Sequence, residues 1–382
     1  MNATRLTAVF SSDELGGSEL FNLEFLRVAR HRGVRIDALV PGEGTLLAAL
    51  KGLADRIEVV PIPDELTSLS RFHGGLEIGR LPARTIALVK YQGRLRRALA
   101  ALPGPTLALG LRAQLAVALA APAGAREVWI VHEIVPEGPA ATMWRLASRR
   151  ADRILTYSRA AAGQAALARR HATVHGVRFN LGRYAAVASG NGARRLGLIG
   201  DLVELKNHMG AIEVLSRVRQ TAPDATLLLV GRDKSRWVPR TAPYVRNVRR
   251  MVDATSGAMI TESSPDDMPA MLSEIDVLLH LSTEPESFGR VIVEAMAAGR
   301  PVVAFDHGAV RELINPGVTG WLCATGDLQA VADAVVQMHS EPDLRRRIGQ
   351  TARTRALARF AADPGARETV GDALADFVLQ GR

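Results

Sequence analysis

The chain has 382 residues, more than one ordinary hydrophobic core uses and suited to two α/β domains. Hydrophobic residues make up 47% of it, but no apolar run reaches the about 20 residues that a membrane-spanning helix needs. The formal charge is +9, carried mainly by arginine, and only 4% of residues are aromatic. Because no basic run is interleaved with aromatic residues, the composition argues against nucleic-acid binding.

The basic residues cluster in two short segments. The simplest interpretation is a solvated helix face, and the alternative is a surface for acidic lipid headgroups. The N-terminus lacks the apolar segment of a signal peptide, and the single cysteine, Cys323, excludes an intrachain disulfide. These features predict a cytoplasmic protein, with peripheral contact at the inner face of an anionic membrane left open. The clustered residues are Arg94, Arg96 and Arg97, and then Arg145, Arg149, Arg150 and Arg153.

Along the first half, short apolar runs alternate with helical patterns, which is typical of βαβ units in a parallel sheet. A helix is predicted from about Ser18 to Arg32, with Gly33 as its C-cap residue. Residues 76–102 also have a helical pattern. The predicted strands of this half span residues 5–12, 34–40, 56–62, 106–111, 127–134 and 153–158.

Residues 182–194 are poor in large apolar side chains and rich in Gly, Ala and Ser, which predicts an interdomain hinge. The strand–helix pattern then restarts, and a final helix is predicted over residues 365–380. The sequence therefore predicts two Rossmann-like domains, residues 1–187 and 188–364, followed by a C-terminal helix, 365–382, packing toward the first. The predicted strands of the second half span 195–201, 225–231, 257–263, 276–282 and 301–307.

The strongest motif is EPESFGRVIVEAMAAGRP, which follows a predicted strand and continues into a predicted helix. The free N–H groups and the dipole at the start of such a helix form a binding site for phosphate. Carboxylates accept hydrogen bonds from the vicinal hydroxyls of sugars. Each glutamate alone is more simply explained as a helix-capping or solvated residue. Together with their surroundings they predict a sugar-nucleotide site. The residues concerned are Glu286, Ser287, Phe288, Gly289 and Glu294.

With seven residues between Glu286 and Glu294, this segment resembles the E-x7-E signature of glycosyltransferase family 4, the retaining GT-B enzymes of group 1 type. The continuation E-A-M-A-x-G-x-P-V-V-A and the segments 311–314 and 317–322 are also similar to that family. The resemblance implies an α/β fold of GT-B architecture, with two Rossmann-like domains facing each other across a cleft and a C-terminal helix crossing back. It also implies a retaining transfer of a hexosyl group from a nucleoside-diphosphate sugar to a hydroxyl acceptor.

The resemblance further assigns roles within the motif. It implies that Glu286 contacts the transferred sugar and that Glu294 contacts the ribose of the nucleotide. The backbone amides near Phe288 and Gly289 would receive the diphosphate or the sugar. The donor would bind mostly to the second domain and the acceptor to the first.

A second motif, GDLVELKN, ends the first strand of the second half. Lys206 falls on the diphosphate-binding lysine of the family, where a cation would stabilise the leaving group. Ordinary solvation at a helix start is the alternative account of this lysine. Asp201 stands where the family has an arginine, which leaves open whether the diphosphate is bound in the usual way. Arg232 follows the next strand and is a candidate replacement, because the carboxyl ends of parallel strands converge.

Two features of the first half match the family in position. Gly16 and Gly17 follow the first strand and precede a helix, where the resemblance implies a loop facing the donor phosphate and the acceptor. His132 ends the strand VWIVHE, where the family tends to place a histidine near the reacting sugar. Tight strand–helix turns and polar strand ends are the structural alternatives for these residues.

No metal site and no cofactor are predicted, because the chain has no D-x-D motif to chelate a diphosphate. The expected co-substrate is a nucleoside-diphosphate sugar of UDP or GDP type, and the acceptor hydroxyl is not specified. Two alternatives share the fold: a non-catalytic nucleotide-sugar-binding or scaffold protein, and a nucleotide-sugar epimerase. A dinucleotide oxidoreductase is disfavoured, since no G-x-G-x-x-G follows the first strand of either half.

Overall fold

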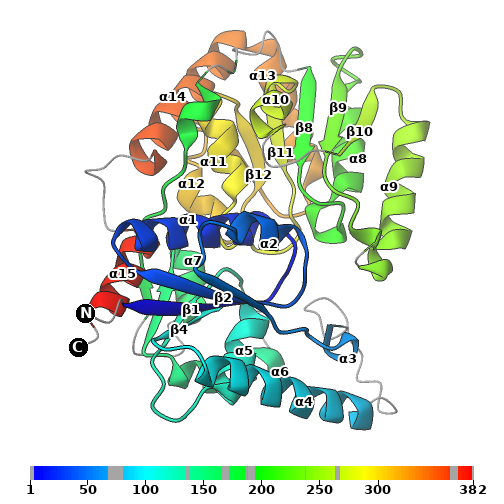
Figure 1. Cartoon of the computed structure of the whole chain (residues 1–382). Coiled ribbons are helices and arrows are strands. Elements are labelled where there is room, and N and C mark those ends of the chain that lie inside the picture. The colour runs from blue at the N-terminus through cyan, green and yellow to red at the C-terminus, as the bar shows by residue number, and fades with distance from the viewer. Residues whose placement is uncertain are drawn as a thin grey trace. The chain divides into compact units, whose positions relative to one another are not determined.

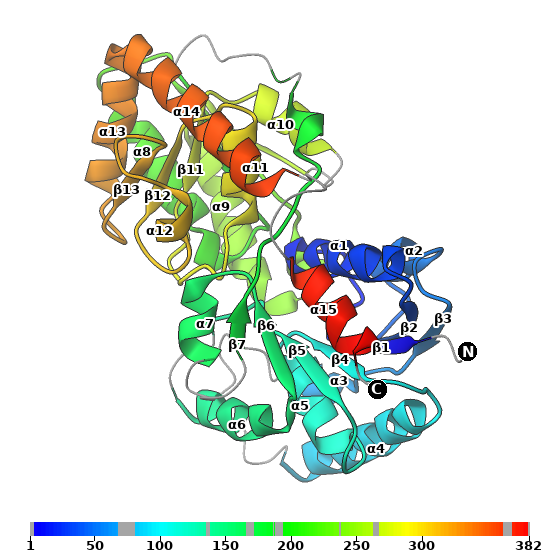
Figure 2. The same cartoon turned by 90° about the vertical axis from the view of Figure 1, so that its left-hand side faces the viewer.

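The structure is a computed structural model, and it describes residues 4–67, 81–134, 138–165, 172–185, 187, 194–236, 238–262, 267–361 and 369–380. Its internal contacts divide the chain into two compact units. Unit 1 comprises residues 1–177 and 367–382, and unit 2 comprises residues 178–366. Each is a parallel sheet with helices on its faces, as Figures 1 and 2 show. The predicted α/β class with two Rossmann-like domains is confirmed.

Unit 1 contains a seven-stranded sheet in the order β3-β2-β1-β4-β5-β6-β7. Its first six strands confirm the predicted ones, and the short β7 was not predicted. The strands are β1 (Arg5–Phe10), β2 (Arg35–Val40), β3 (Arg56–Val59), β4 (Thr106–Leu109), β5 (Glu127–Ile130), β6 (Arg153–Thr156) and β7 (Ala172–Val174). The helices are α1 (Gly17–His31), α2 (Thr45–Leu50), α3 (Asp64–Thr67), α4 (Leu81–Ala100), α5 (Leu111–Ala120), α6 (Pro139–Ala147), α7 (Arg159–Ala165) and α15 (Val370–Leu379).

The central strands of unit 1 are buried on both faces, which is why they appear in the sequence as continuous apolar runs. Trp129 of β5 packs against Trp144 of α6, with ring centroids 6.3 Å apart. The Trp144 indole donates to Gln114 of α5 at 2.7 Å, and Gln114 in turn donates to the carbonyl of Ile130 at 2.8 Å. These bonds satisfy the polar atoms that the packing of α5 and α6 buries.

Unit 2 contains a six-stranded sheet in the order β10-β9-β8-β11-β12-β13. Five of its strands confirm the predicted ones, and β13 was not predicted. The strands are β8 (Arg195–Ile199), β9 (Thr226–Val230), β10 (Ala258–Thr261), β11 (Val277–His280), β12 (Val302–Phe305) and β13 (Trp321–Cys323). The helices are α8 (His208–Val218), α9 (Ala242–Ala254), α10 (Met268–Ser273), α11 (Arg290–Ala297), α12 (Val310–Leu313), α13 (Leu328–Ser340) and α14 (Pro342–Phe360).

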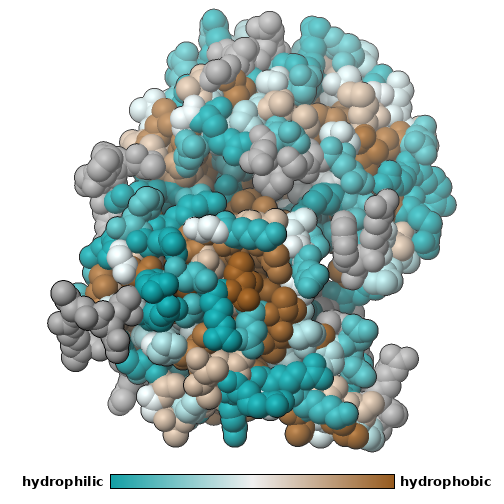
Figure 3. All heavy atoms as spheres, viewed as in Figure 1, coloured by the Kyte–Doolittle hydropathy of each residue, from teal (hydrophilic) through white to brown (hydrophobic). Residues whose placement is uncertain are grey.

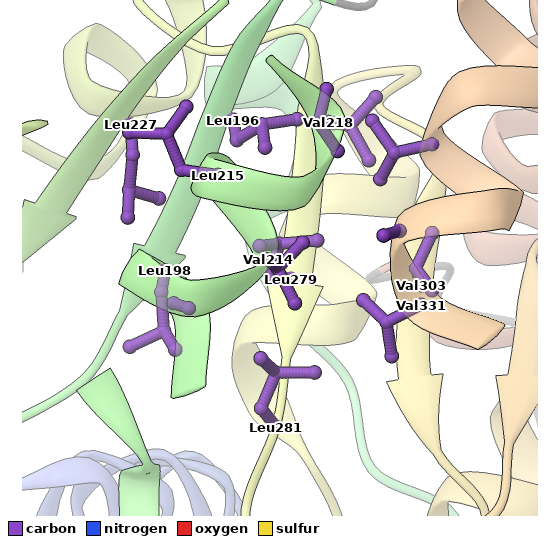
Figure 4. Close-up of a cluster of buried hydrophobic side chains, with 14 of the residues drawn as sticks. Leu196, Leu198, Val214, Leu215, Val218, Leu227, Leu279, Leu281, Val303 and Val331 are labelled. Carbon is purple, nitrogen blue, oxygen red and sulfur yellow. The ribbon is translucent and has the colours of Figure 1, made fainter. Parts of the chain in front are cut away.

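Apolar side chains from the sheet and from α8, α9 and α13 form a buried core cluster in unit 2. Figure 4 shows Val214 and Leu215 of α8 directed at Leu198 and Leu279 of the sheet, with Val331 of α13 completing the cluster. In both units the strand order reverses beside the first strand, between β1 and β4 and between β8 and β11. Ligands of such sheets bind beyond the carboxyl ends of the strands at this reversal.

The boundary between the units differs from the predicted one at residue 187. Phe179 and the following turn belong to unit 2, because the ring of Phe179 packs against Phe288 and Phe360 with centroids 5.9 and 6.2 Å apart. Tyr184, inside the predicted hinge, is buried in the same unit. Residues 186 and 188–193 of that hinge lie outside the described residues. The composition of 182–194 misled the prediction, since it said nothing of where Tyr184, its one aromatic residue, packs.

The second boundary also moves, from residue 364 to residue 366. The final helix begins at Val370 and lies along α1, as Figure 2 shows. None of the described helices combines the length and the apolar character needed to cross a membrane.

The close packing of α15 on α1 supplies a test of the fold. A Cβ atom at Gly371 would lie 2.6 Å from the Cβ of Val28 and 2.9 Å from the carbonyl oxygen of Phe25. We expect Gly371→Ala to lower the free energy of unfolding by about 1–3 kcal/mol, because the two helices must move apart. Gly163→Ala in α7 is the matched control, since no atom lies within 4 Å of its added Cβ. We expect that variant to be neutral or more stable by up to about 1 kcal/mol. Equal melting temperatures in calorimetry would contradict the packing.

Candidate functional site

An ion pair joins the two main motifs of unit 2. The Lys206 ammonium contacts Oε1 of Glu286, although 80 residues separate them in the sequence. Lys206 follows β8 and Glu286 follows β11, and these strands are neighbours in the sheet. The two loops are held together by a hydrogen bond from the Thr283 amide to the carbonyl oxygen of Leu205, 2.8 Å long. The structure therefore brings together the lysine and the glutamate that the sequence placed in one site.

Several groups converge on the Glu286 carboxylate. The Ser282 hydroxyl donates to Oε1 at 2.9 Å, and Nε2 of His280 lies 3.5 Å from the same oxygen. Burial raises the pKa of Glu286, but the Lys206 charge and the adjacent His280 outweigh it and hold that pKa well below 4.5. Glu286 is therefore a carboxylate at neutral pH. An anion held by a cation and a hydroxyl is prepared to accept hydrogen bonds from sugar hydroxyls.

His280 is a site residue that sequence reasoning missed. It is the last residue of β11, its side chain is only 5% exposed, and neither ring nitrogen has a hydrogen-bond partner among the described residues. The pattern of residues 276–282 predicts only an apolar strand. His280 could still have been identified, because it is a histidine at the carboxyl end of a parallel strand just before the E-x7-E segment, and ligands bind beyond such strand ends.

The start of α11 has the geometry that the motif requires. Gly289 is its N-cap residue with φ of 90°, a left-handed conformation that favours glycine. The Phe288 side chain belongs to the hydrophobic core, because its ring is buried and packs against Phe179 and Phe360. Only the backbone of Phe288 remains available to a ligand. Ser287 is half-buried beside it.

Glu294 is not the solvated helix residue of the simpler interpretation. Its side chain is buried and accepts a hydrogen bond from Nε of Arg290 at 3.0 Å, one turn earlier in α11. It also faces the phenol of Tyr184, whose pKa is raised by burial and by the Glu294 charge. Tyr184 comes from the segment predicted as a hinge. Its carboxylate oxygens have lone pairs for further hydrogen bonds from a ligand.

The acid that replaces the family arginine, Asp201, is paired. Nε of Arg232 donates to Oδ1 at 2.9 Å, Nη2 donates to Oδ2 at 3.2 Å, and Nζ of Lys234 lies 2.7 Å from Oδ2. Burial raises the pKa of Asp201, but the charges of Lys234 and Arg232 outweigh this effect, so the pKa lies below its usual value of 3.8. The cluster carries one negative and two positive charges, so its net charge is positive. Lys234 was not among the predicted site residues, because nothing in the sequence shows that it contacts Asp201.

In unit 1, His132 lies just beyond the end of β5. It is buried, its Nδ1 lies 3.1 Å from the Tyr157 hydroxyl, and its Nε2 has no hydrogen-bond partner among the described residues. Burial lowers its pKa to about 4 against the opposing effect of Glu133. At neutral pH the ring is therefore uncharged and has one nitrogen left to bond a ligand.

Gly16 and Gly17 form the entry to α1, and their surroundings differ. The Gly16 amide donates to Oε2 of Glu19 at 3.1 Å, so the first turn of the helix uses it. A Cβ atom at Gly17 would meet no atom within 4 Å. Phe21 of the same helix stacks on Tyr157 at 4.9 Å, and Tyr157 bonds His132. The helix entry and His132 are thus linked within unit 1.

The sign of the Glu286 shift gives a pH dependence. Its folded pKa lies well below 4.5, so the unfolded state binds more protons as pH falls below that value. The carboxylate stabilises the fold above the unfolded pKa, and this stability is lost as pH falls through the folded pKa. We expect the unfolding free energy of the natural protein relative to Glu286→Gln to shrink between about pH 6 and about pH 3 in urea titrations. Glu284→Gln, an exposed position of the same loop, is the control, and equal pH dependence of the two variants would contradict the pairing.

Part of the chain is similar to a known family of proteins. Residues 187–355 match the family model described as glycosyl transferases group 1. The N-acetyl-alpha-D-glucosaminyl L-malate synthase of Bacillus anthracis is 30% identical over 165 residues, 43% of this chain and 41% of that protein. The phosphatidyl-myo-inositol mannosyltransferase of Mycobacterium leprae is 35% identical over 139 residues, 36% of this chain and 34% of that protein. The chain thus spans less than half the length of these two relatives.

Solved structures extend the likeness of fold to both units. The crystal structure of Anabaena HepE in complex with UDP-glucose has a TM-score of 0.76 and 21% identity, covering 99% of this chain and 100% of that one. Sucrose-phosphate synthase from Thermosynechococcus elongatus has a TM-score of 0.72 and 16% identity, covering 99% and 98%. Identities this low show the fold alone. Residues 187–355 therefore match the group 1 model of glycosyl transferases, and the two units share the GT-B fold of these solved structures.

Proposed function

We propose that the protein is a retaining glycosyltransferase that moves a hexosyl group from a nucleoside-diphosphate sugar to a hydroxyl acceptor without a metal ion. The observation that carries the proposal is the contact between Lys206 and Glu286, which joins a cation to the E-x7-E segment at the edge of the sheet. The family match of residues 187–355 supports it. HepE, a structural neighbour, holds UDP-glucose in its crystal structure.

Each residue of the pair has a separate task in this proposal. The Lys206 ammonium would bond the diphosphate, where it stabilises the charge that develops as the leaving group departs. The ammonium has three donors, so it can bond the diphosphate while it stays beside Glu286 and holds that carboxylate as an anion. Its carboxylate would accept hydrogen bonds from hydroxyls of the hexosyl group, and the α11 amides would receive the diphosphate or the sugar.

In the transfer step, the bond between the anomeric carbon and the phosphate oxygen breaks and a bond to the acceptor oxygen forms on the same face of the sugar. The acceptor proton passes to the departing phosphate oxygen, so no protein base is required. Retention of configuration rests on the family resemblance. By the same resemblance, His132 of unit 1 would contact the transferred sugar. A neutral ring suits this role, because an imidazolium there would repel the positive charge that develops on the sugar.

The cluster of Asp201, Arg232 and Lys234 would complete the cationic side of the site. Its net positive charge stands where the family has one arginine. Two cations near a diphosphate offset its charge without a bound metal ion. This pairing removes the electrostatic objection that Asp201 raised to diphosphate binding. The epimerase alternative predicts isomerised sugar when the donor is incubated with no acceptor.

The proposal is tested by turnover of a nucleotide-sugar, with the donor first chosen by thermal shift from UDP-, GDP-, dTDP- and ADP-sugars. We expect Lys206→Ala to lower kcat/KM for release of the nucleoside diphosphate by about 10²–10³-fold, because the variant lacks the cation that stabilises the negative charge of the leaving group. Activity should persist in EDTA. Lys51→Ala, an exposed lysine of unit 1, is the matched control and should leave kcat/KM unchanged. Full activity of Lys206→Ala, or isomerised donor with no transfer, would refute the proposal.

A charge-rescue experiment tests the cluster. Arg232→Ala leaves Asp201 and Lys234 with no net charge, and we expect it to raise the Kd for the nucleoside diphosphate by about tenfold or more. The double variant Asp201→Ala/Arg232→Ala restores the net positive charge through Lys234, so its Kd should return to within a few-fold of the natural protein's. Isothermal titration calorimetry measures both. No recovery in the double variant would mean that Asp201 positions Lys234 rather than only balancing charge.

A further inference from the structure

Exposed apolar side chains gather on three adjacent helices of unit 1. Six of the ten large hydrophobic side chains that are exposed among the described residues lie on α4, α5 and α6. Figures 1 and 2 both show these helices side by side, and Figure 3 shows apolar side chains among hydrophilic ones over the α4 region. The six residues are Ile86, Leu88, Val89, Leu119, Met143 and Leu146.

The exposure follows from how each helix packs. On α4, Tyr91 and Leu95 are buried toward α5, whereas Ile86 and Val89 point outward and are 56% and 66% exposed. On α6, Trp144 donates inward to Gln114, and its neighbour Met143 is exposed. The helices therefore have apolar groups on their inner and their outer faces. Packing on the sheet explains the apolar groups of the inner face but not those of the outer face.

The three helices themselves carry charges of a single sign. The sequences of α4, α5 and α6 contain no aspartate or glutamate. Exposed cations stand among the apolar groups, and Nη2 of Arg96 reaches the carbonyl oxygen of Leu119, 3.4 Å away, so that α4 and the end of α5 form one continuous surface. These cations are Lys90, Arg94, Arg96, Arg97 and Arg112, with Arg149 directly after α6.

We propose that this basic–apolar surface docks the protein on an anionic membrane. The arginine and lysine side chains would bind lipid phosphates, while Ile86, Val89 and Met143 would enter the boundary between headgroups and acyl chains. Exposed apolar groups interspersed with cations, on helices that lie along a surface, are the known requirements for interfacial binding. In this proposal the three helices lie in the plane of the membrane.

Other occupants suit the surface less well. A second copy would bring the same cations face to face, and like charges across an interface cost several kcal/mol. A merely solvated helix face explains the arginines but not the exposed Ile86 and Val89. An acidic protein partner would meet the charge requirement, and the experiment below separates it from lipid.

The test is co-sedimentation of the full chain with phosphatidylcholine vesicles, with and without phosphatidylglycerol. We expect binding only to the anionic vesicles and a decrease with added salt. Arg96→Glu/Arg97→Glu should weaken partitioning by about tenfold or more, since each cation near an anionic surface contributes separately. Ile86→Ser/Val89→Ser should remove the part of the binding that persists at high salt. The matched control is Arg346→Glu/Arg347→Glu, another adjacent pair of exposed arginines, on α14 of unit 2.

Three results would overturn the proposal. The first is absence of binding to anionic vesicles, with or without capture of the chain by an acidic protein. The second is equal loss in the α14 control. The third is sedimentation showing a dimer that Ile86→Ser/Val89→Ser dissociates, with no vesicle binding. Thermal shift with the nucleotide-sugar checks that every variant is folded, and it tests unit 2 independently of the surface. The salt dependence of the natural protein tests the charge contribution even if a variant fails to fold.

Discussion

The pairing of Lys206 with Glu286 is the interaction on which the site depends. It forms because β8 and β11 are adjacent parallel strands, so their carboxyl ends bring two loops together that lie 80 residues apart. Two partly buried charges would each be costly alone, and their contact lowers that cost. The pair also keeps Glu286 ionised against the effect of burial. The same contact that stabilises the two loops therefore holds together the cation and the anion that a nucleotide-sugar needs.

A substitution that looks unfavourable in the sequence is compensated by its neighbours. Asp201 places a negative charge where the family has an arginine, but Arg232 and Lys234 both contact it. The net charge of the three side chains is therefore positive, as it would be for a single arginine. What changes is its distribution, since two side chains from the loop after β9 now supply the cations. Charge in such a site is a property of the cluster, and no single position determines it.

The sequence predicted the strands, the two-domain class and the E-x7-E segment because these depend on local patterns and spacing. It missed the contacts that long-range packing creates. His280 appeared only as the end of an apolar strand, and Lys234 had no motif. Phe179 moved the boundary between units, because its partners Phe288 and Phe360 lie over 100 residues away. The hydrogen bond from the Gly16 amide to Glu19 likewise has no motif of its own. Side-chain partners of this kind cannot be inferred from spacing alone.

Within unit 1, the basic–apolar surface and the predicted ligand-binding residues occupy different parts of the same sheet. The surface is formed by α4, α5 and α6, and α5 packs on a face of the sheet against β4. His132 and the Gly16–Gly17 turn instead follow the carboxyl ends of β5 and β1. A membrane bound to the helix-covered face would therefore leave those strand ends free. The fold can separate attachment from chemistry, because a parallel sheet offers helices on its faces and loops at its edge.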